Sequence, residues 1–259
     1  MLFRSGLRID SPTGRGNDAL VAQPTPDAFQ WGPGGELFAA IGVPGGDDAT
    51  PSTGRLVAWS HPLARRIDVA PLPATATSLA VATRPRPRLA VAAGTRIIVF
   101  DLGADGLPAA ASAREIANLA PNVSPGILLA WSPDGSRLAW GSTGGLVGIL
   151  DADSGARGAM VTSFIRAVRG IVWAHNSRAL FVADEECNRL HDAVTGTMLD
   201  EYRPGWRIRS MTMAESLRGA RGLTLVVAGD DEREAGRGKP TGRLLLVDLG
   251  RRLPRPVGQ

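Results

Sequence analysis

The chain of 259 residues contains a single cysteine, Cys187. One cysteine excludes an intrachain disulfide and any zinc site built from several cysteines. A lone thiol is more often a small, partly buried side chain than a catalytic nucleophile, and we expect the structural role for Cys187.

Long hydrophobic runs are lacking as well. No apolar stretch approaches the roughly 20 residues that cross a bilayer. Residues 1–18 contain only two- or three-residue apolar clusters, whereas a secretory signal has an apolar core of roughly 7–15 residues. We therefore expect a cytoplasmic protein without membrane segments.

Lysine is almost absent: of the 29 basic residues, Lys239 is the single lysine and the others are arginines. A net charge of +4 that comes from arginine throughout the chain is weaker support for nucleic-acid binding than a basic stripe. Arginine groups interleaved with prolines are expected in exposed turns and in the tail. Nucleic-acid binding by these groups stays open as an alternative, and the groups are Arg84, Arg86 and Arg88, then Arg207 and Arg209, then Arg251, Arg252 and Arg255.

The chain does contain a repeated unit of short apolar runs and turns. In LAWSPDGSRLAW, residues 129–140, two apolar runs flank a Ser-Pro-Asp-Gly turn, and related units recur along the chain. Their markers are 50, 50, 42 and 40 residues apart, at Trp31, Val81, Trp131, Trp173 and Met213. Such a period predicts a repeat architecture.

Within each unit, the runs have the composition of β-strands. They contain four to seven residues, are rich in Val, Ile, Leu, Ala and Trp, and end at turn formers. Their nearly continuous apolar positions are typical of sheets buried on both faces. Pro133 presets φ and Gly135 accepts the left-handed conformation, which suits a tight antiparallel turn. Segment 111–120 is left open between a short helix and an outer strand.

Four aspartates stand at the ends of the third runs and precede turns. A carboxylate at this position can accept backbone N–H groups and hold the next turn. We expect this structural role for Asp101, Asp151, Asp192 and Asp248.

The WSPDG turn and the Asp-x-x-(Ser/Thr)-Gly pattern of DADSG and DAVTG resemble the tryptophan-aspartate (WD) repeat β-propeller family, most clearly over residues 126–196. The resemblance implies an all-β fold, a β-propeller of about five four-stranded blades in a single domain over 1–259. The expected blades are approximately residues 20–72, 73–118, 119–163, 164–203 and 204–252.

The fifth blade needs a last strand. After VDLG, the prolines at 254 and 256 each remove a backbone donor, which argues against a paired strand there. Residues 1–12 are a better source, since residues 2–10 contain Leu2, Phe3, Leu7 and Ile9. We predict that this N-terminal segment closes the ring and covers an exposed edge. The alternative is an open arc completed by another chain.

Two long loops, residues 42–54 and 229–242, both contain Gly-Asp-Asp. Closure of the ring would bring them together as an acidic rim, which is a candidate partner-binding surface formed by Asp47, Asp48, Asp230, Asp231 and Glu232. Calcium also favours several carboxylate oxygens, but the loops lack the ligand spacing of an EF-hand, so we expect no metal site.

No catalytic motif is present in the sequence. The three histidines, His61, His175 and His191, form no paired metal motif, and there is neither a Gly-x-Ser-x-Gly elbow nor a phosphate-binding loop. We expect no catalytic residues and no cofactor. The predicted function is a non-enzymatic protein-protein interaction scaffold that binds a protein or peptide on a rigid surface. The alternatives are a propeller hydrolase or lactonase with a central metal, and a weak nucleic-acid-binding module.

Overall fold

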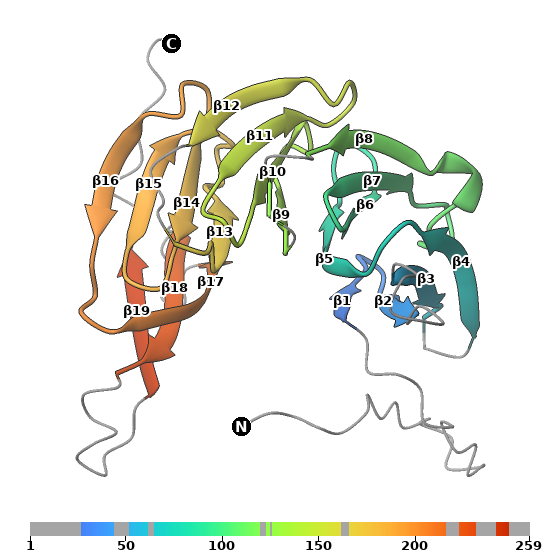
Figure 1. Ribbon diagram of the computed structural model, residues 1–259, viewed down its shortest axis with the longest axis horizontal. Helices are drawn as coiled ribbons and strands as arrows, with labels where there is room; N and C mark the ends of the chain where they lie inside the picture. Colours follow the sequence, from blue (N-terminus) through green and yellow to red (C-terminus); the bar gives the residue numbers. More distant parts are fainter. Residues whose placement is uncertain are drawn as a thin grey trace. The chain divides into compact units, whose positions relative to one another are not determined.

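The computed structural model describes residues 27–43, 52–61, 65–119, 123–124, 126–161, 166–215, 223–231 and 242–248. These residues form 19 β-strands and one short 3₁₀ turn, arranged as five antiparallel sheets (Figure 1). In this part of the chain, no helix is long and apolar enough to span a membrane.

Each sheet is a meander in which strands that follow one another in the sequence pair antiparallel. Sheet 1 contains β1 (Ala28–Trp31), β2 (Leu37–Val43), β3 (Thr53–Trp59) and β4 (Arg66–Leu72). Sheet 2 contains β5 (Ala76–Ala82), β6 (Arg88–Ala93), β7 (Arg96–Asp101) and β8 (Arg114–Asn118), with the 3₁₀ turn η1 (Ala110–Ser112) before β8.

Sheet 3 contains β9 (Leu128–Trp131), β10 (Arg137–Gly141), β11 (Val147–Asp151) and β12 (Arg157–Val161). Sheet 4 contains β13 (Gly170–Trp173), β14 (Ala179–Ala183), β15 (Asn188–Asp192) and β16 (Met198–Tyr202). Sheet 5 has three described strands, β17 (Arg207–Glu215), β18 (Leu223–Asp230) and β19 (Gly242–Asp248).

The sheets belong to two compact units that divide between residues 120 and 121. Sheets 1 and 2 lie in the first unit, where a buried apolar cluster joins them, including Phe38, Leu56 and Phe100. Sheets 3, 4 and 5 lie in the second unit.

In the second unit, one strand shows why the apolar runs are nearly continuous. In β14, Leu180 and Val182 pack in a cluster with sheet 3, whereas Phe181 and Ala183 pack in a cluster with sheet 5. Successive side chains of a strand point to opposite faces, so a strand between two sheets buries every residue. All five residues of β14 are accordingly buried.

The turn between β9 and β10 is held by its own side chains. Gly135 has φ +70° and donates its N–H to Ser132 O at 2.8 Å. The Ser132 hydroxyl donates to Asp134 Oδ1 at 2.6 Å, and the same oxygen accepts the Ser136 N–H at 3.0 Å. These bonds satisfy the backbone of a tight turn, as the Pro-Asp-Gly sequence predicts.

The prediction of an all-β fold built from five antiparallel sheets is confirmed. Each sheet lies within one of the five expected blade segments. Segment 111–120, for which the sequence leaves a helix or a strand possible, contains the end of η1 and the outer strand β8, which pairs with β7. Ring closure and a single domain over 1–259 stay predictions, and the proposed closing strand 1–12 lies outside the described residues.

One arginine differs from its predicted setting. Arg88 was expected in an exposed proline-rich turn, but it is 1% exposed at the start of β6. The turn ends at Pro87, and the inner strand β6 already begins at Arg88, opposite Asp101 of β7. The expectation of exposure is therefore wrong for Arg88, while Arg84 and Arg86 are exposed.

Candidate functional site

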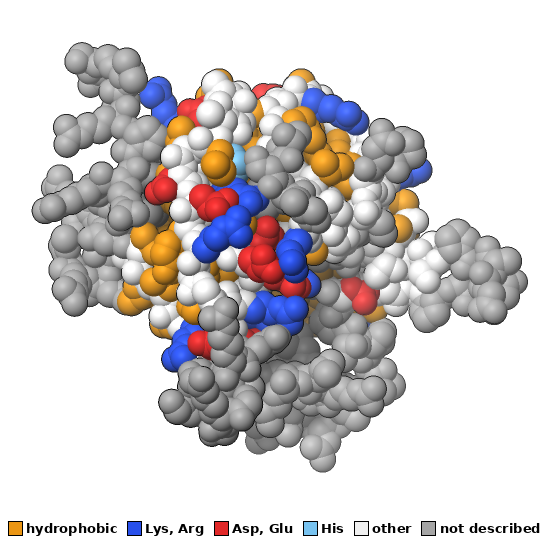
Figure 2. All heavy atoms as spheres, turned by 60° about the vertical axis from the view of Figure 1, so that its left-hand side comes forward, with side chains coloured by type: hydrophobic (Ala, Val, Ile, Leu, Met, Phe, Trp, Pro, Cys, Tyr) orange, Lys and Arg blue, Asp and Glu red, His pale blue; other side chains and the backbone are white. Residues whose placement is uncertain are grey.

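A polar pocket of about 430 Å³ lies in the second unit, where the turn between β14 and β15 meets the start of β17 and the end of β18. Basic and acidic side chains gather side by side on one face of the molecule (Figure 2). The charged pocket, as we call it, is lined by Arg166, Glu185, Glu186, Arg203, Gly205, Trp206, Arg207, Asp230 and Asp231.

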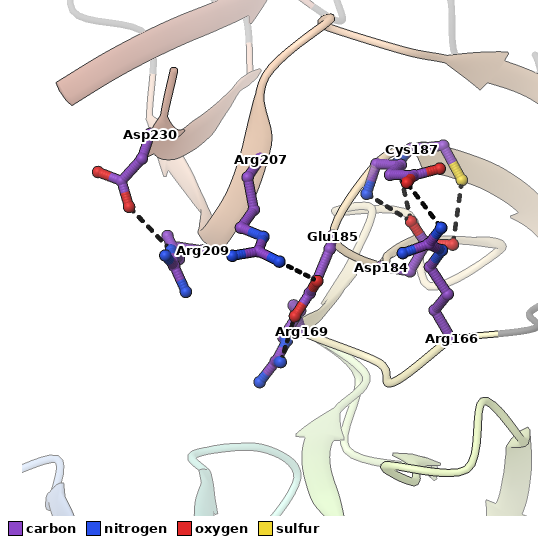
Figure 3. Close-up of polar contacts among 9 residues, drawn as sticks. Arg166, Arg169, Asp184, Glu185, Cys187, Arg207, Arg209 and Asp230 are labelled. Carbon is purple, nitrogen blue, oxygen red and sulfur yellow. Dashed lines mark hydrogen bonds and ion pairs between the residues drawn. The ribbon is translucent and has the colours of Figure 1, made fainter. Parts of the chain in front are cut away.

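Glu185 is the centre of the ion pairs in the charged pocket (Figure 3). Its Oε1 accepts hydrogen bonds from Nε of Arg169, at 3.1 Å, and from Nη2 of the same guanidinium. Its Oε2 lies 3.1 Å from Nη2 of Arg207. The hydrogen bonds from Arg169 lower the pKa of the Glu185 carboxyl, and the charge of Arg207 adds to this effect. Glu185 is therefore a fixed carboxylate between two arginines.

Backbone hydrogen bonds hold these three residues in place. The N–H of Ile208, next to Arg207, donates to Glu185 O at 2.8 Å, and the N–H of Arg169 donates to Ala183 O at 2.8 Å. Glu185 of the turn is thus bonded to the first strand of sheet 5, and the end of β14 is bonded to the segment before β13. Such bonds position the backbone from which the three side chains extend.

Cys187 lies beside the charged pocket but has no exposed thiol. It is 1% exposed, and its Sγ–H donates to Asp184 Oδ2 at 3.3 Å. Asp184 Oδ1 also accepts the N–H groups of Glu186 and Cys187, at 2.7 and 2.8 Å. Burial and then the Asp184 carboxylate raise the pKa of the Cys187 thiol to about 12. A thiol that stays protonated and buried is a poor nucleophile.

Two of the predicted rim residues line this pocket. Asp230 Oδ2 accepts a hydrogen bond from Nε of Arg209 at 2.8 Å, and Asp231 Oδ2 accepts one from Nη2 of Arg243 at 3.2 Å. The described surface around them therefore carries both charges, and the acidic rim stays a prediction. The other three rim residues, Asp47, Asp48 and Glu232, lie outside the described residues.

The central residues of the pocket were not selected from the sequence. The signal for them was an acidic run, Asp184-Glu185-Glu186, in a predicted turn. Arg207 and Arg209 were noted only as a basic group. Arg207 pairs with Glu185 where sheets 4 and 5 meet, and Arg209 pairs with Asp230 across two strands of sheet 5. A one-dimensional pattern contains neither pairing.

The turn aspartates of sheets 3 and 4 bind the turns that follow them. Asp151 Oδ1 accepts the N–H groups of Asp153 and Ser154, at 3.2 and 2.8 Å. Asp192 Oδ1 accepts the N–H groups of Val194 and Thr195, at 2.9 and 2.8 Å. The bond from the Thr195 N–H is the main reason why the pKa of Asp192 is lowered.

The other two turn aspartates differ. Asp101 Oδ1 lies 3.7 Å from Nε of Arg86, and the Ser112 hydroxyl accepts the Asp101 N–H at 2.8 Å. Asp248 ends β19, and its side chain lies outside the description. The same position in the repeat therefore has different contacts in different sheets.

The geometry gives little support to the two alternative functions, nucleic-acid binding and a hydrolase with a central metal. Arg207 and Arg209 are ion-paired with Glu185 and Asp230, which reduces the positive charge available to phosphates. Within the described ranges, no three His, Cys, Asp or Glu side chains gather in a way that could hold a metal ion. A hydrolase site with a central metal thus has no ligand set in this part of the chain.

His191 provides a pH-dependent prediction. It is fully buried, and its Nδ1 lies 3.2 Å from Gly196 O, so the neutral ring donates to that carbonyl. Burial is the main cause that lowers the pKa of His191 below the ordinary value. The unfolded chain therefore binds a proton first as pH falls below about 6.5, which favours unfolding by up to about 1.4 kcal/mol per pH unit.

We expect the free energy of unfolding to fall as the pH drops below about 6.5, and we expect His191→Gln to reduce this slope. Urea titrations at several pH values measure it, and His175→Gln, at an exposed turn position, is the control that should keep the slope. Equal slopes in both variants would contradict the assignment. Carboxylates with lowered pKa values, including Asp192 and Glu201, contribute in a lower window, because their stabilising effect is lost only as pH falls below about 4.

Comparison with known proteins provides no family. No protein-family model and no curated protein matches this chain. One similar solved structure is the crystal structure of the computationally designed Ika4 protein, with 12% sequence identity and a TM-score of 0.48, over 68% of this chain and 92% of that chain. A similarity of this degree says nothing about the function of this chain.

Proposed function

We propose that this chain is a non-enzymatic interaction scaffold of the WD-repeat-like β-propeller type. In this proposal the five sheets are blades, the protein acts in the cytoplasm, and the charged pocket binds a protein or peptide segment. Two features support the propeller assignment: the meander topology repeated in five sheets, and the turn carboxylates Asp151 and Asp192 at equivalent positions of sheets 3 and 4.

The observation that carries the proposal is the Arg169–Glu185–Arg207 arrangement. The Glu185 side chain is 16% exposed, whereas those of Arg169 and Arg207 are 41% and 39% exposed. The more buried carboxylate therefore holds the two guanidinium groups in place, and much of their surface stays exposed to solvent. Arginines held in this way can bind carboxylates or carbonyls of a partner with little loss of side-chain entropy.

Differential affinity capture tests this function. Full-length wild-type protein, Arg207→Glu and Arg178→Glu are immobilised and exposed to a lysate of the native host, and bound proteins are identified by mass spectrometry. Arg207 lines the charged pocket with a side chain that is 39% exposed, so reversing its charge places a carboxylate where the partner's carboxylate would bind. Arg178 is exposed in the turn between β13 and β14 and serves as the matched control.

A partner bound by wild type and Arg178→Glu, but lost from Arg207→Glu, is the expected result. We expect a loss of about tenfold or more in affinity, since like charges across an interface cost several kcal/mol. A partner that binds all three proteins equally would show that the charged pocket is not the interface. Absence of any saturable partner would contradict the scaffold function itself.

A further inference from the structure

Sheets 4 and 5, which both belong to the second compact unit, enclose an apolar groove of about 310 Å³. None of its described lining residues is shared with the charged pocket. The apolar walls come from Phe181 and Leu190 of sheet 4 and from Leu225, Leu245, Leu246 and Val247 of sheet 5.

The face of sheet 4 that borders the groove changes from apolar to polar toward its outer strand. Phe181 of β14 is opposite Leu190 of β15, and Leu190 is opposite Asp200 of β16. In the next row on the same face, Asn188 of β15 is opposite Tyr202 of β16. Phe181 and Leu190 are buried, whereas Asp200 and Tyr202 are exposed. The groove therefore has an apolar interior and a polar mouth.

Asn188 adds a buried hydrogen-bond acceptor to the lining of the groove. The residue is 5% exposed, and among the described residues its Oδ1 has no hydrogen-bond partner. Buried polar atoms are normally hydrogen-bonded, and leaving an acceptor unsatisfied costs free energy. The groove therefore favours an occupant that brings a donor, and an occupant that carries only acceptors would gain nothing at Asn188.

The mouth of the groove has negative charge. Asp200 Oδ1 accepts the N–H of Glu201 at 2.9 Å, which orients the Asp200 carboxylate. The Glu201 side chain points to the other face of the sheet, where Arg189 and Arg203 balance its charge. Tyr202 shares the face of Asp200, and it is 46% exposed, so its ring is accessible to a cation.

We propose that the apolar groove binds a small hydrophobic amine, which consists of an ammonium group on an apolar body. The apolar walls cover the body, and Asn188 Oδ1 accepts an N–H of the ligand. The Asp200 carboxylate and the Tyr202 ring stabilise the positive charge. An anionic ligand of the same size is disfavoured, because it would meet a carboxylate at the mouth.

The volume of the groove limits the size of this ligand. A cavity of about 310 Å³ equals the liquid volume of roughly ten water molecules, so we expect a ligand of about ten non-hydrogen atoms. This volume is at the lower end of the range for small-molecule sites. Phenethylamine has the required size, an apolar ring and an ammonium head, and it is the probe of the test.

Tyr202 is the single tyrosine of the chain, which allows a site-specific measurement. Full-length protein labelled with fluorotyrosine has one tyrosine fluorine resonance, at the mouth of the groove. We expect phenethylamine to shift this resonance saturably, with a dissociation constant of about 1 mM or lower. Hydrocinnamate, which has an anionic head on a similar body, should bind at least about tenfold more weakly. Phenethyl alcohol, a neutral donor, should lie between the two.

Two variants test the polar contacts. Asp200→Asn removes the charge at nearly constant shape, and it should weaken binding of phenethylamine about tenfold while that of phenethyl alcohol changes little. Asn188→Leu removes the buried acceptor at similar volume and should also weaken binding of the amine. Asp153→Asn, which removes an exposed carboxylate of a turn in sheet 3, is the matched control and should bind as wild type does.

A saturable shift that depends on Asp200 and favours the amine over the anion supports the proposal. Equal affinities for amine and anion, or an unchanged affinity in Asp200→Asn, would overturn it. It would also be overturned if phenethylamine gave no saturable shift up to about 10 mM. A resonance that moves when the protein is diluted without ligand would assign the groove to a second copy instead. These measurements do not involve the charged pocket, so their failure leaves the proposed function unaffected.

Discussion

Replacing Gly196 with alanine is expected to lower the free energy of unfolding by about 3 kcal/mol, as the sum of backbone strain and overpacking. Gly196 has φ +76°, a conformation that costs an L-residue energy. A Cβ atom there would also lie 2.6 Å from Met160 O of β12, a backbone atom that cannot rotate away. The turn after β15 thus approaches sheet 3 too closely for any side chain.

Gly205 separates these two contributions. It has φ +78°, but a Cβ atom at this position would meet nothing within 4 Å. Gly205→Ala is therefore expected to cost only the strain, about 1 kcal/mol. Urea-induced unfolding followed by circular dichroism measures both variants. Equal losses would mean that Met160 moves without cost and that the contact between β12 and this turn is loose.

The five-sheet arrangement was predictable because its signals are local. Pro133, Asp134 and Gly135 determine a tight turn within a few residues, and the apolar runs between such turns have the length of strands. A run that lies between two such turns could therefore be assigned without knowledge of its neighbours. The outer strand β8 was ambiguous, because its residues Arg114–Asn118 include one buried side chain, and the pattern alone did not distinguish it from a short helix.

Side-chain contacts between neighbouring strands were not predictable. The Arg88 side chain belongs to a proline-rich segment that is typical of exposed turns, yet the inner strand begins at this residue. Asp230 of β18 binds Arg209 of the neighbouring strand β17 at 2.8 Å, a pairing that no local pattern specifies. In both cases the outcome depends on which strands become neighbours.

The turn aspartates and the charged pocket show the same difference between contacts that are local in the sequence and contacts that depend on the fold. Asp151 and Asp192 bind N–H groups two and three residues ahead, a short-range geometry that the sequence pattern specifies. Glu185 binds Arg169 and Arg207, which lie on separate elements. A function that depends on Glu185 therefore has no sequence motif of its own.

Arg137 connects sheets 3 and 4, and its removal is the second large effect that we expect. From the start of β10, its Nη1 donates to Ala193 O at 3.1 Å and its Nη2 donates to Ser177 O. Its guanidinium carbon lies 5.1 Å from the centre of the Trp173 ring, a cation–π contact. Ala193 and Ser177 are both buried, so neither carbonyl is well placed to bind water after the arginine is removed.

Arg137→Ala is expected to reduce the free energy of unfolding by about 3 kcal/mol, because two buried acceptors lose a charged donor. Arg137→Lys should lose roughly half of this, since an ammonium group cannot donate to both carbonyls in the geometry of a planar fork. Arg157→Ala, at an exposed position of the same sheet, is the control and should change stability by less than about 0.5 kcal/mol. Chemical unfolding with tryptophan fluorescence measures all three. If lysine were as stabilising as arginine, charge alone would account for the contact, and the two-carbonyl geometry would not be the cause of the link between the sheets.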